Sequence, residues 1–280
     1  MTKDTFNLPF VKMHGAGNDY VFVDGFESDV PAVLGELARR VSNRHTGIGS
    51  DGLIVMFPCR ENDCDVRMQM WNADGTRGDI CGNGIRCVAL WMSLTDRTAQ
   101  KCRIRTDARL VTVNQLDLCR RSGRGSFAAM MGQAQIRDRL QITLSDQTYD
   151  CQQVSMGNPH AVIWTDDLST AHVHSVGPQI AEHQLFPDGT NVEFVRRIDA
   201  GTLDVRVWER GSGETQACGS GACAVAAAAV ASGHCETDAP IGVRLPGGTL
   251  TIHTSAEGIT MSGPAEVSFT GSILLRPLDR

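Results

Sequence analysis

The sequence lacks the features that mark membrane, secreted and zinc-binding proteins. No apolar run approaches the ~20 residues that cross a bilayer, and the start, MTKDTFNLPF, lacks the basic-then-apolar pattern of a signal peptide. The net charge of −6 argues against a general affinity for nucleic acid or anionic membranes. We therefore expect a soluble, cytoplasmic protein with no nucleic-acid partner and no membrane partner.

The ten cysteines include no pair with CxxC spacing, so their spacing gives no zinc site. A disulfide framework needs an oxidising compartment, for which the sequence carries no targeting signal. Most of these residues should then be small buried hydrophobic side chains or exposed ones without a role.

Two of the cysteines stand in a distinctive setting. Cys81 lies in ICGNGIRCVALW (residues 80–91) and Cys218 lies in ACGSGACAVAAAA (residues 217–229). Each is followed by Gly, a small polar residue, Gly and an apolar run, and the two are 137 residues apart (218 − 81). A chain of 280 residues with 41% hydrophobic content can hold one large domain or two of about 140 residues. The two copies suggest two related halves that meet at one site.

Other segments repeat at nearly the same spacing. HGAGNDYVFVD (14–24) faces VSMGNPHAVIW (154–164) at an offset of 140, which places Asn18 opposite Asn158 (158 − 18). GSDGLIV (49–55) faces GTNVEFV (189–195) at the same offset. VRMQMWNADG (66–75) faces LDVRVWERGS (203–212) at an offset of 137. Ordered matches at a nearly constant offset predict a duplicated fold.

Each half has the same pattern of strands and helices. YVFVD, LIVMF and VRMQMW are short β-rich runs, and the runs at 110–113 and 243–252 would complete each sheet. A helix over 30–42 would place Val33, Leu34, Leu37, Ala38 and Val41 on one face. GIRCVALWMSL and GACAVAAAAVAS are apolar nearly all round, as in a central, buried helix.

We therefore predict an α+β fold of two pseudo-symmetric halves, each a curved, mostly antiparallel sheet around a central helix. Residues 1–130 would form the N-terminal half with Cys81, and residues 131–280 would form the C-terminal half with Cys218. The Gly-rich stretch RRSGRGS (120–126) reads as a surface loop near the boundary between them.

A cysteine just before a helix has a particular chemistry. The first turn of a helix leaves N–H groups without intrahelical partners and carries partial positive charge. A thiolate there is stabilised, so the thiol pKa can fall below the free value of about 8.5, and the same N–H groups can hold a carboxylate. Two thiols facing each other across such a seat suit the inversion of a carbon beside a carboxylate. One thiolate removes a proton from one face, and the opposite thiol returns a proton to the other.

These residues resemble a known family. NADGTRGDICGNGIRC (72–87) is similar to the signature of the diaminopimelate epimerases. The similarity extends from Lys12 to about Ala229 through KMHGAGNDYVFVD, RHTGIGSDGLIV, MGNPHAVIW, DGTNVEFV and WERGSGETQACGSGACA. The resemblance implies a cofactor-independent isomerase that interconverts LL- and meso-diaminopimelate in lysine and peptidoglycan precursor synthesis. It implies no metal, pyridoxal phosphate or flavin.

The resemblance also implies roles for individual residues. Cys81 and Cys218 would be the catalytic acid/bases, supported by His160 and Glu209. Gly82 with Asn83, and Gly219 with Ser220, would seat the carboxylate at the reacting carbon, and Arg210 would bind the distal carboxylate through two hydrogen bonds. The full set of implied substrate contacts is Asn18, Asn72, Gly82, Asn83, Asn158, Asn191, Glu209, Arg210, Gly219 and Ser220.

The sequence departs from the family pattern in places, and it leaves alternatives open. Thr76 stands where a serine is usual, Arg77 stands where an acidic residue is frequent, and the stretch 106–135 matches poorly. One alternative is a racemase of the same fold that acts on proline, hydroxyproline or histidine. Another is a non-enzymatic binding protein with the duplicated fold. The oligomeric state is open, and a homodimer is compatible with the resemblance.

Overall fold

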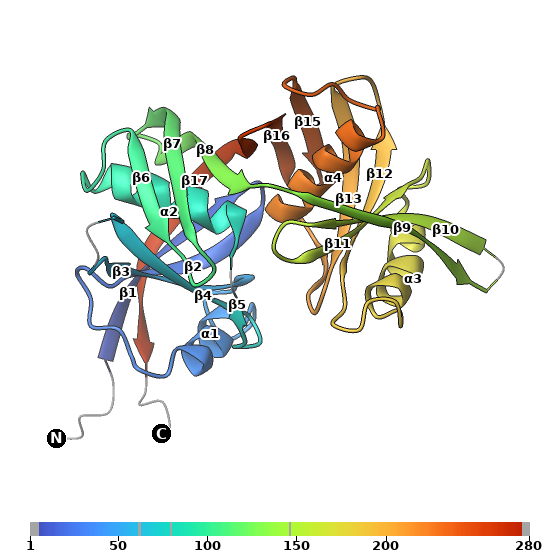
Figure 1. The fold of residues 1–280 in the computed structure, drawn as a ribbon. Coiled ribbons are helices and arrows are strands. Elements are labelled where there is room, and N and C mark those ends of the chain that lie inside the picture. The colour runs from blue at the N-terminus through green and yellow to red at the C-terminus, as the bar shows by residue number, and fades with distance from the viewer. Residues whose placement is uncertain (1–5, 61–62, 79, 146, 276–280) are drawn as a thin grey trace. The chain divides into compact units, whose positions relative to one another are not determined.

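The computed structural model describes residues 6–60, 63–78, 80–145 and 147–275, and its chain forms two compact units (Figure 1). Unit 1 contains the described residues up to Ala129 together with those from Pro264 onward, and unit 2 contains Met130–Gly263. The chain passes between the units within two strands, β8 (Arg124–Gly132) and β17 (Gly258–Leu275). No helix among the described residues is long and apolar enough to cross a membrane.

Unit 1 is built from nine further strands and helices besides its parts of β8 and β17. In chain order they are β1 (Phe6–Gly15), β2 (Asn18–Asp24), α1 (Leu34–Ser42), β3 (Gly52–Pro58), β4 (Val66–Asn72), β5 (Arg77–Gly78), α2 (Gly82–Leu94), β6 (Lys101–Arg105) and β7 (Leu110–Cys119). The strands pair in the order β1–β2–β3–β4–β6–β7–β8, and β17 pairs with both β8 and β1. These pairings close the sheet on itself, so that α2 can lie inside it.

Unit 2 repeats this order of elements. It contains β9 (Gln135–Leu144), β10 (Gln147–Ser155), β11 (Pro159–Trp164), α3 (Thr170–Ala181), β12 (Asn191–Arg197), β13 (Thr202–Glu209), β14 (Gly213–Thr215), α4 (Gly219–Ala231), β15 (Pro240–Leu245) and β16 (Gly248–Ser255). The pairing β11–β12 is parallel like β2–β3, β13–β15 is parallel like β4–β6, and the other pairings with a described register are antiparallel. The predicted duplication and the mostly antiparallel α+β architecture are confirmed.

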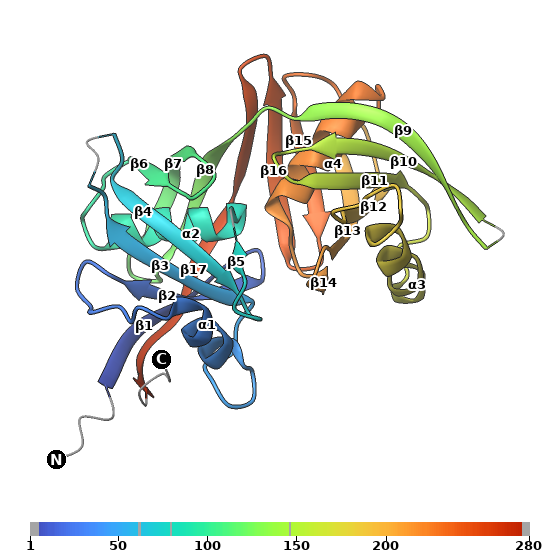
Figure 2. The same ribbon diagram turned by 60° about the horizontal axis from the view of Figure 1, so that its bottom comes forward.

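The central helices are buried as the sequence predicts. All residues of α2 except Trp91 and Leu94 are buried, and α2 packs against β1, β2, β6 and β7 (Figure 1). Helix α4 packs against the corresponding strands of unit 2, β10, β11, β15 and β16. The outer helices repeat as well, because α1 packs on β2–β4 and α3 packs on β12–β14 (Figure 2).

Two expectations about the elements are corrected. The helix expected over 30–42 begins at Leu34, and Val33 is its N-cap, with non-helical backbone angles (φ −97°, ψ 75°) and an exposed side chain rather than a place on the buried face. The run 243–252 is not one strand, because residues 246–247 form a turn between β15 and β16.

The end of the described chain belongs to unit 1, although the sequence groups it with the second half. Strand β17 passes out of unit 2 at Gly263 and then runs antiparallel to β1, pairing from Glu266 opposite His14 to Leu275 opposite Phe6. The partner of this strand lies more than 250 residues away in the sequence (266 − 14 = 252), and no local pattern reveals such a pairing.

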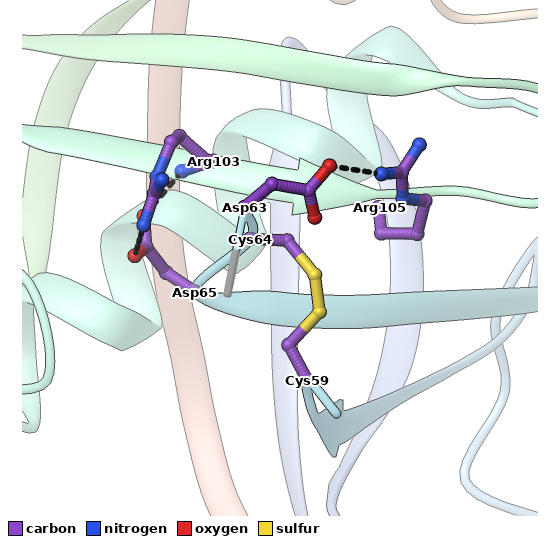
Figure 3. The surroundings of a disulfide bond; sticks show 6 residues. All are labelled: Cys59, Asp63, Cys64, Asp65, Arg103 and Arg105. Carbon is purple, nitrogen blue, oxygen red and sulfur yellow. Dashed lines mark hydrogen bonds and ion pairs between the residues drawn. A yellow bond between two sulfur atoms is a disulfide. The ribbon is translucent and has the colours of Figure 1, made fainter. Parts of the chain in front are cut away.

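Cys59 and Cys64 form a disulfide, although the sequence gives no reason to expect a disulfide framework (Figure 3). They lie between β3 and β4 with their Cα atoms 5.9 Å apart, which is within the usual range for a bridge. Ion pairs between Asp63 and Arg105 and between Asp65 and Arg103 flank the bridge. The sequence spacing did not indicate this pair, because the two cysteines form no recognised motif. The end of β3 and the start of β4 bring them together.

Candidate functional site

Cys81 and Cys218 occupy the same position in their units, the N-cap of the central helix. The Sγ of Cys81 accepts a hydrogen bond from Gly84 N at 3.3 Å, and the Sγ of Cys218 accepts one from Gly221 N at 3.4 Å. A cap side chain that accepts from the third helical residue satisfies one of the otherwise unpaired N–H groups of the first turn. The predicted placement of both cysteines is confirmed.

The residues after each cysteine precede the first intrahelical hydrogen bond. That bond is donated by Ile85 to Cys81 in α2 and by Ala222 to Cys218 in α4, each at 2.9 Å. Gly82 and Asn83, and Gly219 and Ser220, therefore lie in the first turns of their helices, where backbone N–H groups point out of the helix end. This is the kind of position that suits a carboxylate.

In unit 1, Asn18 links Cys81 to two other polar groups. Its Oδ1 atom accepts hydrogen bonds from the Cys81 thiol at 3.4 Å and from Asn83 Nδ2 at 3.2 Å. Its Nδ2 group donates to Asp51 at 2.7 Å. Asn83 in turn accepts a bond of 2.8 Å from Arg86, a guanidinium with no exposed surface. Three predicted site residues thus form one connected group, which also includes Asp51 and Arg86.

Asp51 is part of a wider cluster of charges. Arg44 donates to both Asp19 and Asp51, at 2.7 and 2.9 Å, and Lys12 forms an ion pair with Asp19. Burial and the neighbouring charge of Asp19 raise the pKa of Asp51. Burial acts in the same direction on Asp19, but the hydrogen bonds from Arg44 and Lys12 outweigh it, so the pKa of Asp19 is lowered. The cluster holds Asn18 with its oxygen directed toward Cys81.

Asn72 and its neighbours account for the two departures from the family signature. The Asn72 amide donates to the Thr76 hydroxyl at 2.9 Å, and that hydroxyl donates to Asp74 at 2.6 Å, so threonine supplies the hydroxyl expected of serine. Arg77 lies over the ring of Trp71, 4.3 Å from its centroid, and pairs with Asp107 at 2.6 Å. The extra positive charge is therefore neutralised by Asp107.

In unit 2, a chain of hydrogen bonds begins at Cys218. Its Sγ lies 3.5 Å from Ser220 Oγ, which accepts a bond of 3.3 Å from Asn158 Nδ2. The Oδ1 atom of Asn158 lies 3.1 Å from Nε2 of His160, and Nδ1 of His160 lies 2.6 Å from Glu193 Oε1. Four predicted site residues are thus joined in sequence, and the chain ends at a carboxylate that the sequence did not single out.

The charge state of Cys218 differs from the sequence-based expectation. A helix N-terminus lowers a thiol pKa, but burial, followed by the carboxylates of Glu209 and Glu193, raises the pKa of Cys218 well above its ordinary value. The hydrogen bonds from Ser220 and Gly221 act in the opposite direction and are outweighed. Cys218 is therefore a thiol at neutral pH. The sequence pattern could not show how completely the surrounding strands bury this side chain, which is 6% exposed.

The remaining predicted residues lie at the end of β13, in the turn that follows it and at the start of β12. Glu209 accepts a hydrogen bond from the hydroxyl of Thr215 on β14. The backbone N–H of Arg210 donates to Asn191 Oδ1 at 2.9 Å, and its guanidinium donates to the carbonyl oxygen of Asp188 at 2.7 Å. Asn191 also donates to the carbonyl oxygen of Pro159 at 3.2 Å. Asn191 therefore ties the Arg210 turn to β11.

Sequence reasoning missed Glu193 and Asp51, although each carries a signal. Glu193 is an acidic residue inside the otherwise apolar run NVEFV, and Asp51 directly precedes the strand GLIV. The sequence predicted an offset of 140 between β3 and β12, and this offset hid which of their residues correspond. Leu53 pairs with Trp71 and Val192 pairs with Trp208, so the structural offset is 139 (192 − 53), and Ile54 corresponds to Glu193.

Comparisons with known proteins identify the family. The sequence model of the family "Diaminopimelate epimerase" matches residues 10–136 and 153–268. The diaminopimelate epimerase of Bacillus cytotoxicus is 40% identical over 273 residues, covering 92% of this chain and 94% of that protein. That of Desulforudis audaxviator is 40% identical over 281 residues, covering 94% and 98%.

Solved structures share the fold at much lower identity. A probable proline racemase from Agrobacterium radiobacter has a TM-score of 0.76 at 15% identity, covering 95% of this chain and 92% of that chain. A hydroxyproline epimerase from Agrobacterium vitis has a TM-score of 0.72 at 15% identity, covering 99% and 94%. These structures establish the shared architecture alone, whereas the sequence matches cover almost the whole chain and include both cysteine segments. The chain belongs to the diaminopimelate epimerase family.

Proposed function

We propose that this chain interconverts LL- and meso-diaminopimelate without a cofactor, with Cys81 and Cys218 as the acid/base pair. The observation that carries the proposal is the repeated geometry of the two cysteines. Each caps a buried central helix, and its Sγ accepts an N–H of that helix. The two relatives that are 40% identical over more than nine-tenths of the chain are diaminopimelate epimerases.

The reaction would proceed by transfer of one proton on each face of the α-carbon. A thiolate takes the α-proton and becomes a thiol, and the electron pair left on carbon is delocalised into the adjacent carboxylate. The N–H groups of Gly82, Asn83, Gly219 and Ser220 would stabilise the negative charge that develops there. The opposite thiol then gives its proton to the other face and becomes the thiolate, so protons and charge balance.

The reaction needs each cysteine in both charge states. For one stereoisomer Cys81 would be the thiolate that takes the α-proton and Cys218 the thiol that gives one. For the other stereoisomer the two roles would be exchanged.

Arg210 would select the substrate. Its backbone is fixed by Asn191 and one of its guanidinium nitrogens is held by Asp188, which leaves further N–H groups for a second carboxylate. Diaminopimelate carries a distal carboxylate, whereas proline and hydroxyproline do not. The product would supply lysine and peptidoglycan precursor synthesis, as the resemblance implies, in the cytoplasm.

The test is to incubate the purified chain with LL-diaminopimelate in deuterium oxide. We expect deuterium at one α-carbon together with formation of the meso isomer, and no exchange with L-proline under the same conditions. Exchange of proline but not of diaminopimelate would support a racemase of the same fold instead. Absence of exchange with either amino acid would contradict the proposal.

A further inference from the structure

Glu193 is a wholly buried carboxylate beside the proposed site. It lies on β12, neither its side chain nor that of His160 has exposed surface, and the 2.6 Å contact joins its Oε1 atom to His160 Nδ1. Its second oxygen, Oε2, has no hydrogen-bond partner among the described residues. Burying a carboxylate without a partner costs folding free energy, so the contact with His160 has to offset most of that cost.

The chain of contacts fixes where the protons lie. An amide oxygen only accepts, so with Asn158 Oδ1 facing it, Nε2 of His160 must donate. Nδ1 and Glu193 Oε1 then share a further proton, and the pair has no net charge. At the other end, Asn158 donates to Ser220 Oγ, so the Ser220 hydroxyl hydrogen can point to Cys218 Sγ. The chain therefore allows Ser220 to be the donor in its 3.5 Å contact with Cys218, where either atom can donate.

Unit 1 presents the opposite polarity to its cysteine. Ile54 lies at the place that corresponds to Glu193. A Cβ atom added to Gly84 would meet the Ile54 side chain, and one added to Gly221 would meet Glu193 Oε1. Tyr20 stands in the place of His160, at the offset of 140 that relates β2 to β11. Asn18 is turned by Asp51 so that an acceptor faces Cys81. The buried acid and imidazole are thus specific to the Cys218 side.

We propose that Glu193 is a positioning residue for Cys218: paired with His160, it fixes the direction of the Asn158–Ser220 chain so that Ser220 donates to the sulfur. The inference rests on the proposed function, in which Cys218 must alternate between thiol and thiolate. A donor held at the sulfur lowers the cost of forming the thiolate in a buried setting that otherwise disfavours it.

The first test reads the imidazole directly and needs no activity. The ring nitrogens of the full chain are labelled with ¹⁵N-histidine, and His160 is assigned with His160→Gln. We expect Nε2 of His160 to carry a proton at neutral pH and Nδ1 to share one with Glu193. In Glu193→Gln one of these two protons should be lost, because a neutral amide cannot share a proton with the ring as a carboxylate does. An unprotonated Nε2 in the wild type would overturn the proposed direction.

The second test measures the pH dependence of Cys218 alkylation by iodoacetamide, followed by mass spectrometry of the separate cysteine peptides. In Glu193→Gln the pair is again without net charge, so loss of a fixed Ser220 donor should dominate and move the alkylation midpoint to higher pH. If Glu193 acted only as a negative charge, its removal would move the midpoint to lower pH. A lower or unchanged midpoint therefore overturns the inference.

The third test uses kinetics. Glu193→Gln should lower kcat for epimerisation by at least ~10-fold, the size expected for loss of one charged hydrogen bond. KM should change little, since Glu193 is not among the proposed substrate contacts. Glu193→Ile introduces the residue type found at the corresponding place in unit 1, and it should lower kcat by a similar factor. In a Ser220→Ala background, Glu193→Gln should cost less than ~2-fold further, because coupled residues are not additive. An undiminished effect in that background would show a merely structural role.

Controls separate the possible failures. Thr254→Val removes another buried polar group of unit 2 whose hydroxyl has no partner among the described residues, and it should leave kcat unchanged. Thermal midpoints show whether each variant folds. Wild-type protein that does not epimerise diaminopimelate contradicts the proposed function, whereas an active wild type with an equally active Glu193→Gln contradicts only the role of Glu193.

Discussion

The side-chain oxygen of Asn191 accepts the backbone N–H of Arg210 at 2.9 Å, while its amide nitrogen donates to the carbonyl oxygen of Pro159 at 3.2 Å. Asn191 is 6% exposed, and both bonds go to main-chain atoms. The side chain therefore joins the start of β11 to the turn after β13. This contact gives Asn191 a role in holding Arg210, whether or not it also contacts a substrate.

Removal of this contact should impair turnover through Arg210. We expect Asn191→Ala to lower kcat/KM for diaminopimelate by at least ~10-fold and the free energy of unfolding by about 1–3 kcal/mol, as for a buried hydrogen-bonded group left unpaired. Steady-state kinetics and urea unfolding measure the two effects. Asn191→Asp keeps the acceptor for Arg210 and should retain more activity than the alanine variant. Equal activity of the alanine variant and the wild type would show that turnover does not depend on the contact between Asn191 and Arg210.

Arg210→Lys should weaken turnover although it keeps the charge. A lysine cannot make two parallel hydrogen bonds to a carboxylate, and one charged hydrogen bond contributes roughly 1.5–3 kcal/mol, so kcat/KM should fall by at least ~10-fold. Arg196→Lys is a suitable control, because Arg196 pairs with Asp204 on the neighbouring strand of unit 2. If both variants keep wild-type kinetics, Arg210 does not bind the substrate.

Replacement of either cysteine by serine should stop epimerisation and preserve the fold. Serine is nearly isosteric, but its much higher pKa makes it a poor base. Cys81→Ser and Cys218→Ser should each still exchange the α-proton on the face that keeps its cysteine, so the two variants should prefer different stereoisomers. Deuterium incorporation from each stereoisomer, followed by NMR, tests this. Wild-type epimerisation by either variant would refute the two-thiol mechanism.

The protein should lose stability in alkaline solution. Burial raises the pKa of Cys87, Cys102 and Cys151 to about 12. Above the unfolded thiol value of about 8.5, the unfolded chain releases protons that the folded chain keeps, so each thiol lowers the free energy of unfolding by about 1.4 kcal/mol per pH unit up to its folded pKa. The contribution is thus complete below pH ~8.5 and declines as the pH rises toward about 12.

Urea unfolding with reductant at pH 8 and pH 10 measures this decline. Cys151→Ala removes one of the three thiols, and its free energy of unfolding should fall less steeply between the two pH values than that of the wild type. A stability that is equal at both pH values would show that these thiols are not held protonated in the folded chain.

Loss of the Cys59–Cys64 disulfide should have a modest effect on stability and none on catalysis. The bridge closes a short loop, for which the chain-entropy relation gives about 2 kcal/mol. Cys59→Ser should therefore lower the free energy of unfolding by no more than about 2 kcal/mol and leave kcat unchanged. Cys119→Ser, which replaces an exposed free cysteine, is the matched control. A large loss of activity in Cys59→Ser alone would link this loop to the site.

The predictions that succeeded rest on local patterns. Two apolar runs of helical length, each opened by Cys-Gly-x-Gly, were enough to place Cys81 and Cys218 at the N-caps of buried helices. The repeat was visible because its asparagines lie at or beside the ends of strands, where chemistry and geometry are closely linked.

The features that were missed depend on tertiary structure. The one-residue change of offset on β3 and β12 concealed that an isoleucine and Glu193 occupy corresponding places, and strand register is set by pairing rather than by composition. The raised pKa of Cys218 depends on burial by several strands, which opposes what the local helix terminus predicts. The pairing of β17 with β1 depends on residues from opposite ends of the described chain.

That last pairing has a consequence for biosynthesis. Unit 2 is formed by one continuous segment, so all of its residues are synthesised before the final strand segment of unit 1, residues 264–275. Contacts of high sequence separation form slowly, since a long loop must close first. A chain that ends before residue 264 holds every residue of unit 2 but leaves β1 without β17, so after release from the ribosome it should bury Cys218 but leave the sheet around Cys81 open.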